Sequence, residues 1–289
     1  MNELLSALII AVVQGLTEWL PVSSSGHLVL FSRLLGFDGG MMFDVALHFG
    51  TLMAVFVYFG GDIVDIVKDL LSLKFGSENG RLGLLILVAT LPAVFFGLLL
   101  RGIFEEVFGN LGIVALGFGI TGLVLLIASF SEVKRDGAHP PTLSSSGKKL
   151  SEERGKILSS RVIEVGQKRF GYFDGFLVGC AQVLALFPGI SRSGSTISSG
   201  LLLGLNEKNA MKFSFLMSIP VIFGANVLVI GNNTLTSSLV WATLISFVVG
   251  LITIHVLYKW VLTSRKNLKW FAIYALGLGA GLGIWLGIS

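Results

Sequence analysis

Residues 14–27 have the sequence QGLTEWLPVSSSGH and lie in the middle of an otherwise apolar segment, residues 3–35. Pro21 and the serines and glycine that follow it break a continuous helix, and each half of the segment is too short to cross ~30 Å of hydrocarbon. A second segment, residues 172–204, is broken in the same way by PGISRSGST at residues 188–196. Irregular backbone at membrane depth is tolerated only where protein or a water-filled cavity surrounds it. Both segments are therefore predicted to be re-entrant helix–loop–helix pairs; the alternative is two short helices joined by a surface loop.

The composition of the 289-residue chain excludes an ordinary soluble domain. Hydrophobic residues make up 53% of the chain and charged residues 13%, and the mean hydropathy is +0.84; soluble domains carry about 25% charged residues. Six uninterrupted apolar stretches are long enough to span a bilayer. They cover residues 43–60, 82–101, 111–130, 211–230, 237–258 and 268–288. The predicted fold is an all-α polytopic membrane protein of about ten helical segments, six spanning and two re-entrant pairs.

The two broken segments match each other when one is shifted by 168 positions. The shift aligns a glutamine, two serines and two glycines without a gap: Gln14 with Gln182, Ser23 with Ser191, Ser25 with Ser193, Gly26 with Gly194 and Gly36 with Gly204. An internal duplication explains this common register. Each half would hold one re-entrant pair and three spanning helices, and because three is odd the second half would be inverted. The predicted units are a first repeat over 1–130, a linker over 131–171 and a second repeat over 172–289.

The distribution of lysine and arginine predicts the orientation in the membrane. The net charge of +4 does not indicate nucleic-acid binding, because the basic residues sit in loops beside the spanning helices. Arg33 and Arg101 are the two that lie near one face, whereas 18 of the 21 fall on the other, in loops 61–81, 131–171, 205–212 and 259–269. By the positive-inside rule, the face with the 18 basic residues is cytoplasmic. Both termini are then outside, and the loops of the two re-entrant pairs enter from opposite sides and meet near the midplane.

Ionisable side chains inside the membrane segments are few, and such residues are functional candidates because burying a charge is costly. Glu18 and His27 lie in the first broken segment and Arg192 in the second. Gln14 precedes Glu18 by four residues and so shares its helix face. His48 and His255 stand on apolar helices without an obvious partner, and they are interpreted as structural.

The second loop has the composition of an oxyanion site. Arg192 is permanently charged, and the free backbone N–H groups of the following helix begin beside it. Phosphate is the anion that such a site would bind. The candidate substrate-binding residues are loop hydroxyls and one loop glycine: Ser191, Ser193, Thr196 and Gly189, with Ser23 and Ser25 in the opposite loop. The alternative is that these residues serve helix packing and that Arg192 pairs with Glu18 as a structural lock.

The first loop adds groups that phosphoryl transfer requires. That reaction needs a nucleophile, a proton acceptor and neutralisation of charge. His27 is a candidate nucleophile or general base, and a serine is the other candidate nucleophile. Glu18 could orient His27 or, together with Gln14, hold a divalent cation. Oxygen ligands of this kind favour Mg²⁺ or Ca²⁺.

These two loops resemble the signatures of the bacitracin-resistance family of undecaprenyl-diphosphate phosphatases. Residues 14–27 are similar to the first signature and residues 188–196 to the second, usually written PGxSRSxxT; length, helix pattern and duplication agree over nearly the whole chain. The resemblance implies a multi-pass enzyme of the bacterial inner membrane that hydrolyses undecaprenyl diphosphate to the monophosphate. It further implies divalent-metal dependence, a site open to the outer face, carrier recycling for cell-wall synthesis and bacitracin resistance. The positions that match catalytic or diphosphate-binding residues are Glu18, Ser24, His27, Ser191, Arg192 and Thr196.

Two features distinguish this chain from many members of that family, although the pattern of the first signature allows either glutamate or glutamine at position 14. Gln14 stands where many members have glutamate, so a metal ion there would depend on Glu18 and an amide oxygen. The linker at 132–170 also looks longer than usual. The alternative function is a secondary transporter or lipid flippase, because inverted repeats with broken helices are typical of transporters; the combination of Glu18, His27 and Arg192 favours bond cleavage instead. The expected partners are a polyprenyl diphosphate and membrane lipids without nucleic acid, and a homodimer stays open.

Overall fold

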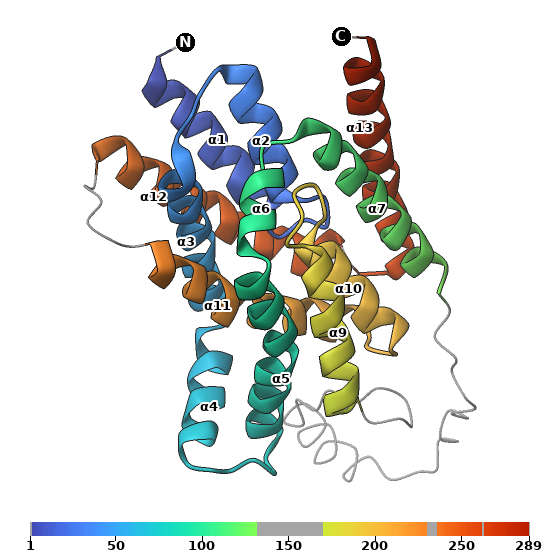
Figure 1. The fold of residues 1–289 in the computed structure, drawn as a ribbon. Helices are drawn as coiled ribbons and strands as arrows, with labels where there is room; N and C mark the ends of the chain where they lie inside the picture. Colours follow the sequence, from blue (N-terminus) through green and yellow to red (C-terminus); the bar gives the residue numbers. More distant parts are fainter. Residues whose placement is uncertain (1, 132–169, 230–235, 262, 289) are drawn as a thin grey trace.

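The computed structural model describes residues 2–131, 170–229, 236–261 and 263–288, and this part of the chain is helical throughout, without a strand (Figure 1). Six helices are long and apolar enough to cross a membrane. They are α3 (Gly40–Tyr58), α5 (Glu78–Leu99), α7 (Leu111–Phe130), α11 (Glu207–Val229), α12 (Ser237–Val256) and α13 (Leu268–Ile288). The prediction of an all-α, multi-pass membrane protein with six spanning helices is confirmed. Most of the predicted linker lies outside the described residues.

Two pairs of shorter helices occupy the broken segments. The first pair is α1 (Glu3–Thr17) and α2 (Ser24–Leu35), and the second is α9 (Tyr172–Leu184) and α10 (Arg192–Leu202). Figure 1 shows α1 and α2 at the end of the molecule that holds both termini, and α9 and α10 toward the other end, with both connecting loops turned to the centre. The loops touch there, because the Ser193 hydroxyl donates to the Leu20 carbonyl oxygen across 3.0 Å. The predicted meeting of the loops is observed, and their depth in a bilayer stays a prediction.

Matched residues of the two pairs have the same local role. The side-chain oxygens of Ser23 and Ser191 accept from the backbone N–H three residues further on, across 3.3 and 3.0 Å. Each serine thereby satisfies a donor that the start of its helix leaves unpaired. Within two residues of the end of each helix stands a glycine with positive φ, +58° at Gly36 and +105° at Gly204, where the lack of a Cβ permits the turn. These parallels support a duplication, and its inverted arrangement stays a prediction.

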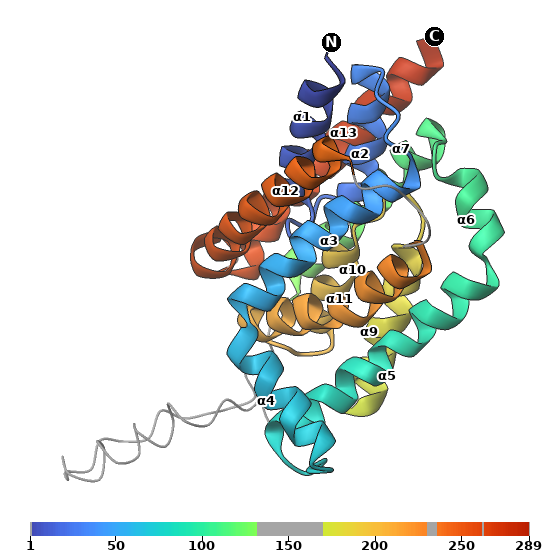
Figure 2. The same cartoon turned by 90° about the vertical axis from the view of Figure 1, so that its left-hand side faces the viewer.

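Two further helices lie where the sequence predicted only loops. α4 (Gly60–Leu71) follows α3, and α6 (Arg101–Val107) follows α5. Figures 1 and 2 show α4 beside the start of α5, at the end of the molecule away from the termini. Both helices escaped prediction because a criterion tuned to spans of ~20 apolar residues does not register short helices. Near the C-terminus, a π-helical turn (Leu257–Val261) extends α12, and a 3₁₀ turn (Arg265–Asn267) leads into α13.

Glycines let the helices approach closely around the loops. A Cβ on Gly179 of α9 would lie 2.3 Å from the Ala89 carbonyl oxygen of α5, and one on Gly117 of α7 would lie 2.4 Å from the Pro188 carbonyl oxygen of the second loop. Close contacts of this kind are typical of helices that associate in lipid, where hydrophobic burial does not drive packing. Beside the first loop, the fully buried Trp19 meets a phenylalanine of α11 edge-on. Both loops are therefore held on a well-packed support.

Candidate active site

Glu18 is the centre of a buried polar cluster where the two loops meet. It follows α1 directly, and its side chain is 2% exposed. Its Oε1 forms an ion pair with Nη2 of Arg192, the first residue of α10. Its Oε2 accepts from the Ser24 hydroxyl across 2.6 Å and from the Gln14 amide across 2.9 Å. The fold thus brings four of the predicted site residues into contact, from both halves of the chain.

Arg192 keeps one terminal nitrogen available for a ligand. Its Nη1 is buried and has no hydrogen-bond partner among the described residues. The guanidinium carbon lies 5.7 Å from the centre of the Trp19 ring, which shields one side of the group. Leaving a buried donor unsatisfied costs roughly 1–3 kcal/mol, and more for a charged group. The ion pair with Glu18 is present, as expected if Arg192 is a structural lock. A bound anion would nevertheless be stabilised further by accepting a hydrogen bond from Nη1.

The four loop serines that were predicted to bind substrate mainly cap helices and contact one another in the structure. Ser23 and Ser191 cap their helices, and their hydroxyls lie 3.3 and 3.2 Å from those of Ser25 and Ser193. Ser23 adopts φ +69°, a conformation that costs a non-glycine residue on the order of 1–3 kcal/mol and is found mostly at functional sites. The first loop is therefore strained at the residue that precedes the candidate nucleophile Ser24. The substrate-binding role of these serines stays a prediction.

Thr196 and Gly189 also make contacts within the protein. The Thr196 hydroxyl is 2.7 Å from the Arg192 carbonyl oxygen and 2.6 Å from the Ser214 hydroxyl, so it fastens α10 to α11. Gly189 has φ +89°, and a Cβ there would lie 2.3 Å from the Val114 carbonyl oxygen of α7. Only glycine fits this backbone and this approach. Both residues place the phosphate-binding loop, and direct contact with a substrate stays a prediction for each.

The hydrogen-bond partners found for His27 are Ser23 and Tyr274 and are not residues that bond to Glu18. Its side chain is buried, with Nδ1 2.6 Å from the Ser23 carbonyl oxygen and Nε2 2.7 Å from the Tyr274 hydroxyl. A carbonyl oxygen can only accept, so Nδ1 carries the hydrogen and, in the neutral ring, Nε2 accepts from Tyr274. The two rings are stacked, with centroids 5.8 Å apart. Ser23 and Tyr274 therefore orient His27, in place of the Glu18 that the sequence suggested.

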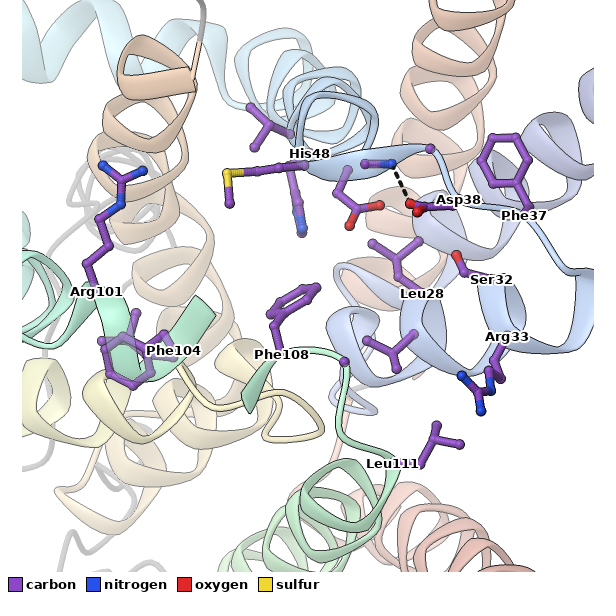
Figure 3. A pocket seen from close by; sticks show the side chains of 18 of the residues that line it. Leu28, Ser32, Arg33, Phe37, Asp38, His48, Arg101, Phe104, Phe108 and Leu111 are labelled. Atoms are coloured by element: carbon purple, nitrogen blue, oxygen red, sulfur yellow. Dashed lines mark hydrogen bonds between the residues drawn. The ribbon is translucent and has the colours of Figure 1, made fainter. Parts of the chain in front are cut away.

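A cavity of about 860 Å³ lies beside the cluster, between α2, α3, α6 and the start of α7. His48 of α3 connects the two: its Nδ1 is 3.1 Å from Glu18 Oε2 and 2.9 Å from the Gln14 amide nitrogen, and its ring lines the cavity. Figure 3 shows His48 and Phe108 pointing into the cavity from opposite sides. Much of the remaining wall is apolar, with side chains such as Leu28, Val29, Met41, Phe104, Leu111 and Leu186. His48 therefore has partners, Glu18 and Gln14, that the sequence did not indicate, and its interpretation as a structural residue stays a prediction.

The chain matches the family model described as Bacitracin resistance protein BacA over residues 7–281. It belongs to this family. A relative from Thermosipho melanesiensis is 37% identical over 269 residues, which cover 93% of this chain and 94% of the relative. Relatives from Trichlorobacter lovleyi and Caldicellulosiruptor bescii are each 38% identical, over 99% and 95% of this chain and 98% and 94% of their own lengths. All three carry the name undecaprenyl-diphosphatase.

In this member of the BacA family, sequence reasoning missed several polar side chains at the site. His48 could have been found, because an ionisable residue in a spanning helix is a functional candidate by default. Thr121 of α7 donates to the Gly189 carbonyl oxygen across 3.0 Å and accepts from the Ser191 N–H across 2.9 Å. Tyr274 stands 247 positions from its partner histidine. No local pattern could indicate contacts that depend on how distant helices pack.

The site of this BacA family member offers ligands for a divalent cation. Gln14 Oε1 is buried without a hydrogen-bond partner among the described residues, and the carboxylate of Glu18 lies beside the same side chain. Carboxylate and amide oxygens are ligands that hard divalent cations use. Within the described ranges, no three His, Cys, Asp or Glu residues form a metal-binding group. An ion would therefore depend on the Gln14 amide as well as on Glu18, and both residues fit that role.

Tyr274→Phe is expected to lower the stability of the protein by about 1–3 kcal/mol, because it leaves the buried His27 Nε2 without a donor. Unfolding of purified protein in a fixed lipid–detergent mixture measures the change. Tyr172→Phe, at an exposed tyrosine of α9, is the matched control and should unfold like the wild type. Equal stability of Tyr274→Phe and Tyr172→Phe would show that the hydroxyl does not hold His27.

Proposed function

We propose that this chain is an undecaprenyl-diphosphate phosphatase, which hydrolyses undecaprenyl diphosphate to undecaprenyl phosphate and inorganic phosphate. Relatives of that name match it over nearly their full lengths. The observation that carries the proposal is the Glu18–Arg192 pair across the two loops. The Ser24 hydroxyl donates to the Glu18 carboxylate, and Arg192 Nη1 has no hydrogen-bond partner in the described part of the chain. Glu18 as proton acceptor, Ser24 as candidate nucleophile and Arg192 as hydrogen-bond donor to the phosphate thereby share one buried site.

Hydrolysis adds one water molecule across the phosphoanhydride. A bond forms between an attacking oxygen and the terminal phosphorus, and the bond from that phosphorus to the bridging oxygen breaks, so that the lipid monophosphate leaves. If Ser24 attacks, its hydroxyl proton passes to the Glu18 carboxylate that already accepts it, and water later cleaves the phosphoserine. If water attacks directly, Glu18 or His27 takes its proton. The choice between His27 and a serine as nucleophile stays open.

Arg192 supplies the charge that the phosphate group requires. A phosphate competes with Glu18 for the guanidinium, and Nη1 is ready to donate to a second oxygen. When the guanidinium turns to the phosphate, Glu18 Oε1 is released to act as a base. A divalent cation, which the sequence suggests is Mg²⁺ or Ca²⁺, would neutralise further phosphate charge; Glu18 and Gln14 would hold it.

The cavity gives the substrate a route to the site. Its apolar wall suits the first isoprene units of the tail, while His48 leads the head group toward Glu18. Arg33 and Arg101, the two basic residues predicted on the sparsely charged face, both line it. The cavity would therefore open to the outer side of the bacterial inner membrane, with the termini on that side and the 131–171 linker in the cytoplasm. The product would return to cell-wall synthesis, and depletion of the diphosphate that bacitracin captures would confer resistance.

Two repeats, 1–130 and 172–289, would form this site jointly. Glu18 and Ser24 come from the first and Arg192 from the second, so neither repeat would hold the site alone. A secondary transporter or flippase with the same architecture would require a phosphate-binding site, but not a hydroxyl paired with a carboxylate beside it. We therefore propose hydrolysis and not transport as the function.

Release of phosphate by the purified protein tests the function. Detergent-solubilised wild type should release one phosphate for each undecaprenyl diphosphate, a chelator should stop the release, and Mg²⁺ should restore it. A protein that binds the lipid diphosphate but releases no phosphate with any divalent cation would contradict the proposal.

The orientation can be tested with single cysteines in a Cys180→Ala background. Gly76 and Gly109 are exposed, and an added Cβ at either position meets no atom within 4 Å, so cysteine should be accommodated at both. An impermeant maleimide should label Gly109→Cys in intact cells and Gly76→Cys only after lysis, since the second lies on the lysine- and arginine-rich face. The reverse labelling pattern would invert the proposed topology.

A further inference from the structure

Thr121 of α7 holds the backbone of the second loop at two points. Its hydroxyl donates to the Gly189 carbonyl oxygen across 3.0 Å and accepts from the Ser191 N–H across 2.9 Å. A hydroxyl can donate and accept at the same time, so both bonds form together, one on each side of Ile190. Thr121 is buried, and so are Gly189 and Ser191. It therefore fixes the stretch of chain that leads directly to Arg192.

The hydroxyl of Thr121 is used differently from those of other threonines in the spanning helices. Thr90 of α5 and both Thr243 and Thr253 of α12 donate to the carbonyl oxygen four residues earlier in their own helix, which is a common local bond for a helical threonine. Thr121 is instead directed to a loop that lies 68 and 70 positions further along the chain. Its bonds thus join the first predicted repeat to the second.

The face of α7 that carries Thr121 is shaped to receive this loop. A Cβ on Gly117 would lie 2.4 Å from the Pro188 carbonyl oxygen, and a Cβ on Gly189 would lie 2.3 Å from the Val114 carbonyl oxygen. Val114, Gly117 and Thr121 are spaced by three and four residues, so they share one face of the helix. The loop therefore rests on α7 by close backbone contact, and Thr121 supplies the hydrogen bonds that set its position.

The position of Ser191 determines where Arg192 begins. Ser191 is the N-cap of α10, with its hydroxyl accepting from the Gly194 N–H across 3.0 Å, and Arg192 follows it as the first residue of that helix. We propose that Thr121 is a positioning residue for the phosphatase reaction: by holding the backbone on both sides of Ile190, it aims Arg192 at the phosphate of a lipid diphosphate. The inference rests on the proposed function and adds a residue that acts through Arg192.

Loss of the Thr121 hydroxyl should affect turnover more than affinity. Without it, the Ser191 N–H and the Gly189 carbonyl oxygen are buried polar groups without this partner, and the loop is expected to shift to satisfy them. The ion pair with Glu18 would still keep the Arg192 guanidinium near the site, so substrate would still bind. Because a misplacement of ~1 Å can cost about 10²-fold in rate, Thr121→Val should lower kcat by roughly 10–10²-fold and change KM much less.

Steady-state release of phosphate from undecaprenyl diphosphate by the purified protein tests the inference, with melting temperatures recorded to show that each variant is folded. Thr121→Ser keeps the hydroxyl and should restore most of the turnover that Thr121→Val loses. Thr90→Val is the matched control, because it removes a buried threonine hydroxyl that bonds within its own helix. Its kcat should equal that of the wild type.

A double-mutant cycle with Arg192→Lys distinguishes positioning from general packing. If Thr121 acts through Arg192, Thr121→Val should cost at most ~3-fold in the Arg192→Lys protein, since residues that act as a unit have non-additive effects. Wild-type kcat in folded Thr121→Val, an equal loss in Thr90→Val, or the full loss again in the Arg192→Lys protein would overturn the inference. If Thr121→Val does not fold, Thr121→Cys replaces it in the cycle, because a thiol is only a weak donor and acceptor.

The wild type separates this inference from the proposed function. Phosphate release by the wild type, together with wild-type kcat in Thr121→Val, would defeat the positioning role alone. No release by the wild type with any divalent cation would defeat the phosphatase and the positioning role with it.

Discussion

Arg192→Lys is expected to lower the turnover of phosphate release by about 10²–10³-fold, the range found when one donor to a developing oxyanion is lost, and almost as far as Arg192→Ala. The Arg192 guanidinium has one terminal nitrogen on Glu18 and another that is buried and unpaired among the described residues. It can therefore meet two acceptors at once. Lysine keeps the charge but is a single point donor on a flexible stem, so it cannot make both contacts.

The loss should fall on turnover as well as on affinity. Charge builds up on the phosphoryl oxygens as the bond to the bridging oxygen breaks, so a donor aimed at those oxygens stabilises the transition state more than the bound substrate. The side chains of Arg192 and Glu18 are 17% and 2% exposed, so charge interactions in the cluster are screened less than at the protein surface. Steady-state kinetics of the two variants would separate the effect on kcat from the effect on KM.

Arg265→Lys is the matched control for this prediction. Arg265 is also a buried arginine in an ion pair, 3.2 Å from Glu207, but it joins the ends of α7 and α11 away from the loops. Lysine there should leave turnover near the wild-type value. If Arg192 served only as a structural lock on Glu18, Arg192→Lys would likewise retain activity, and Arg192→Ala would mainly destabilise the protein, by ~3–5 kcal/mol. Wild-type turnover in Arg192→Lys would thus contradict the phosphate-binding role.

Glu18→Gln is expected to lower phosphate release by about 10²–10⁴-fold, the usual contribution of a general acid or base. The substitution keeps the shape of the side chain but removes the negative charge. The amide oxygen of glutamine can still accept a hydrogen bond from the Ser24 hydroxyl, which now lies 2.6 Å from the carboxylate, but it cannot take up the proton as a carboxylate can. The substitution also removes the charged ligand from the proposed metal site. His27→Ala should also lower release if the imidazole takes part in the reaction.

Glu207→Gln repeats the same change at the ion pair with Arg265 and should leave the reaction rate unaltered. Melting temperatures recorded beside the rates show whether each variant is folded. Near-normal hydrolysis by folded Glu18→Gln would leave Glu18 with a structural role only, and the proposed chemistry would have to move to another residue.

The sequence predicted the spanning helices and the broken segments well, because both depend on local hydrophobicity and on residues that break helices. α3 and α7 agree with their apolar stretches to within a few residues. The contact between the loops followed from the opposite directions in which the two pairs were predicted to enter. α4 and α6 were missed, since short helices carry no comparable signal.

The candidate site was predicted in part. Glu18, Ser24 and Arg192 meet as the motifs suggested. The sequence did not indicate Tyr274 as a partner of His27, because Tyr274 approaches from the last helix and only tertiary packing brings it there. The partners of His48 were missed for a similar reason: Gln14 lies on another helix and Glu18 directly follows it, and the helix of His48 is otherwise apolar.

Following the fate of a labelled lipid in liposomes tests the central claim most directly. Undecaprenyl diphosphate carrying one label in the terminal phosphate and another in the lipid is reconstituted with wild type, with Arg192→Lys or without protein. The wild type is expected to release the terminal phosphate into solution while the lipid label appears as undecaprenyl monophosphate, and Arg192→Lys should do so at least ~10²-fold more slowly. Transfer of the intact diphosphate across the bilayer, with both labels still in one molecule, would contradict the account and identify the protein as a transporter.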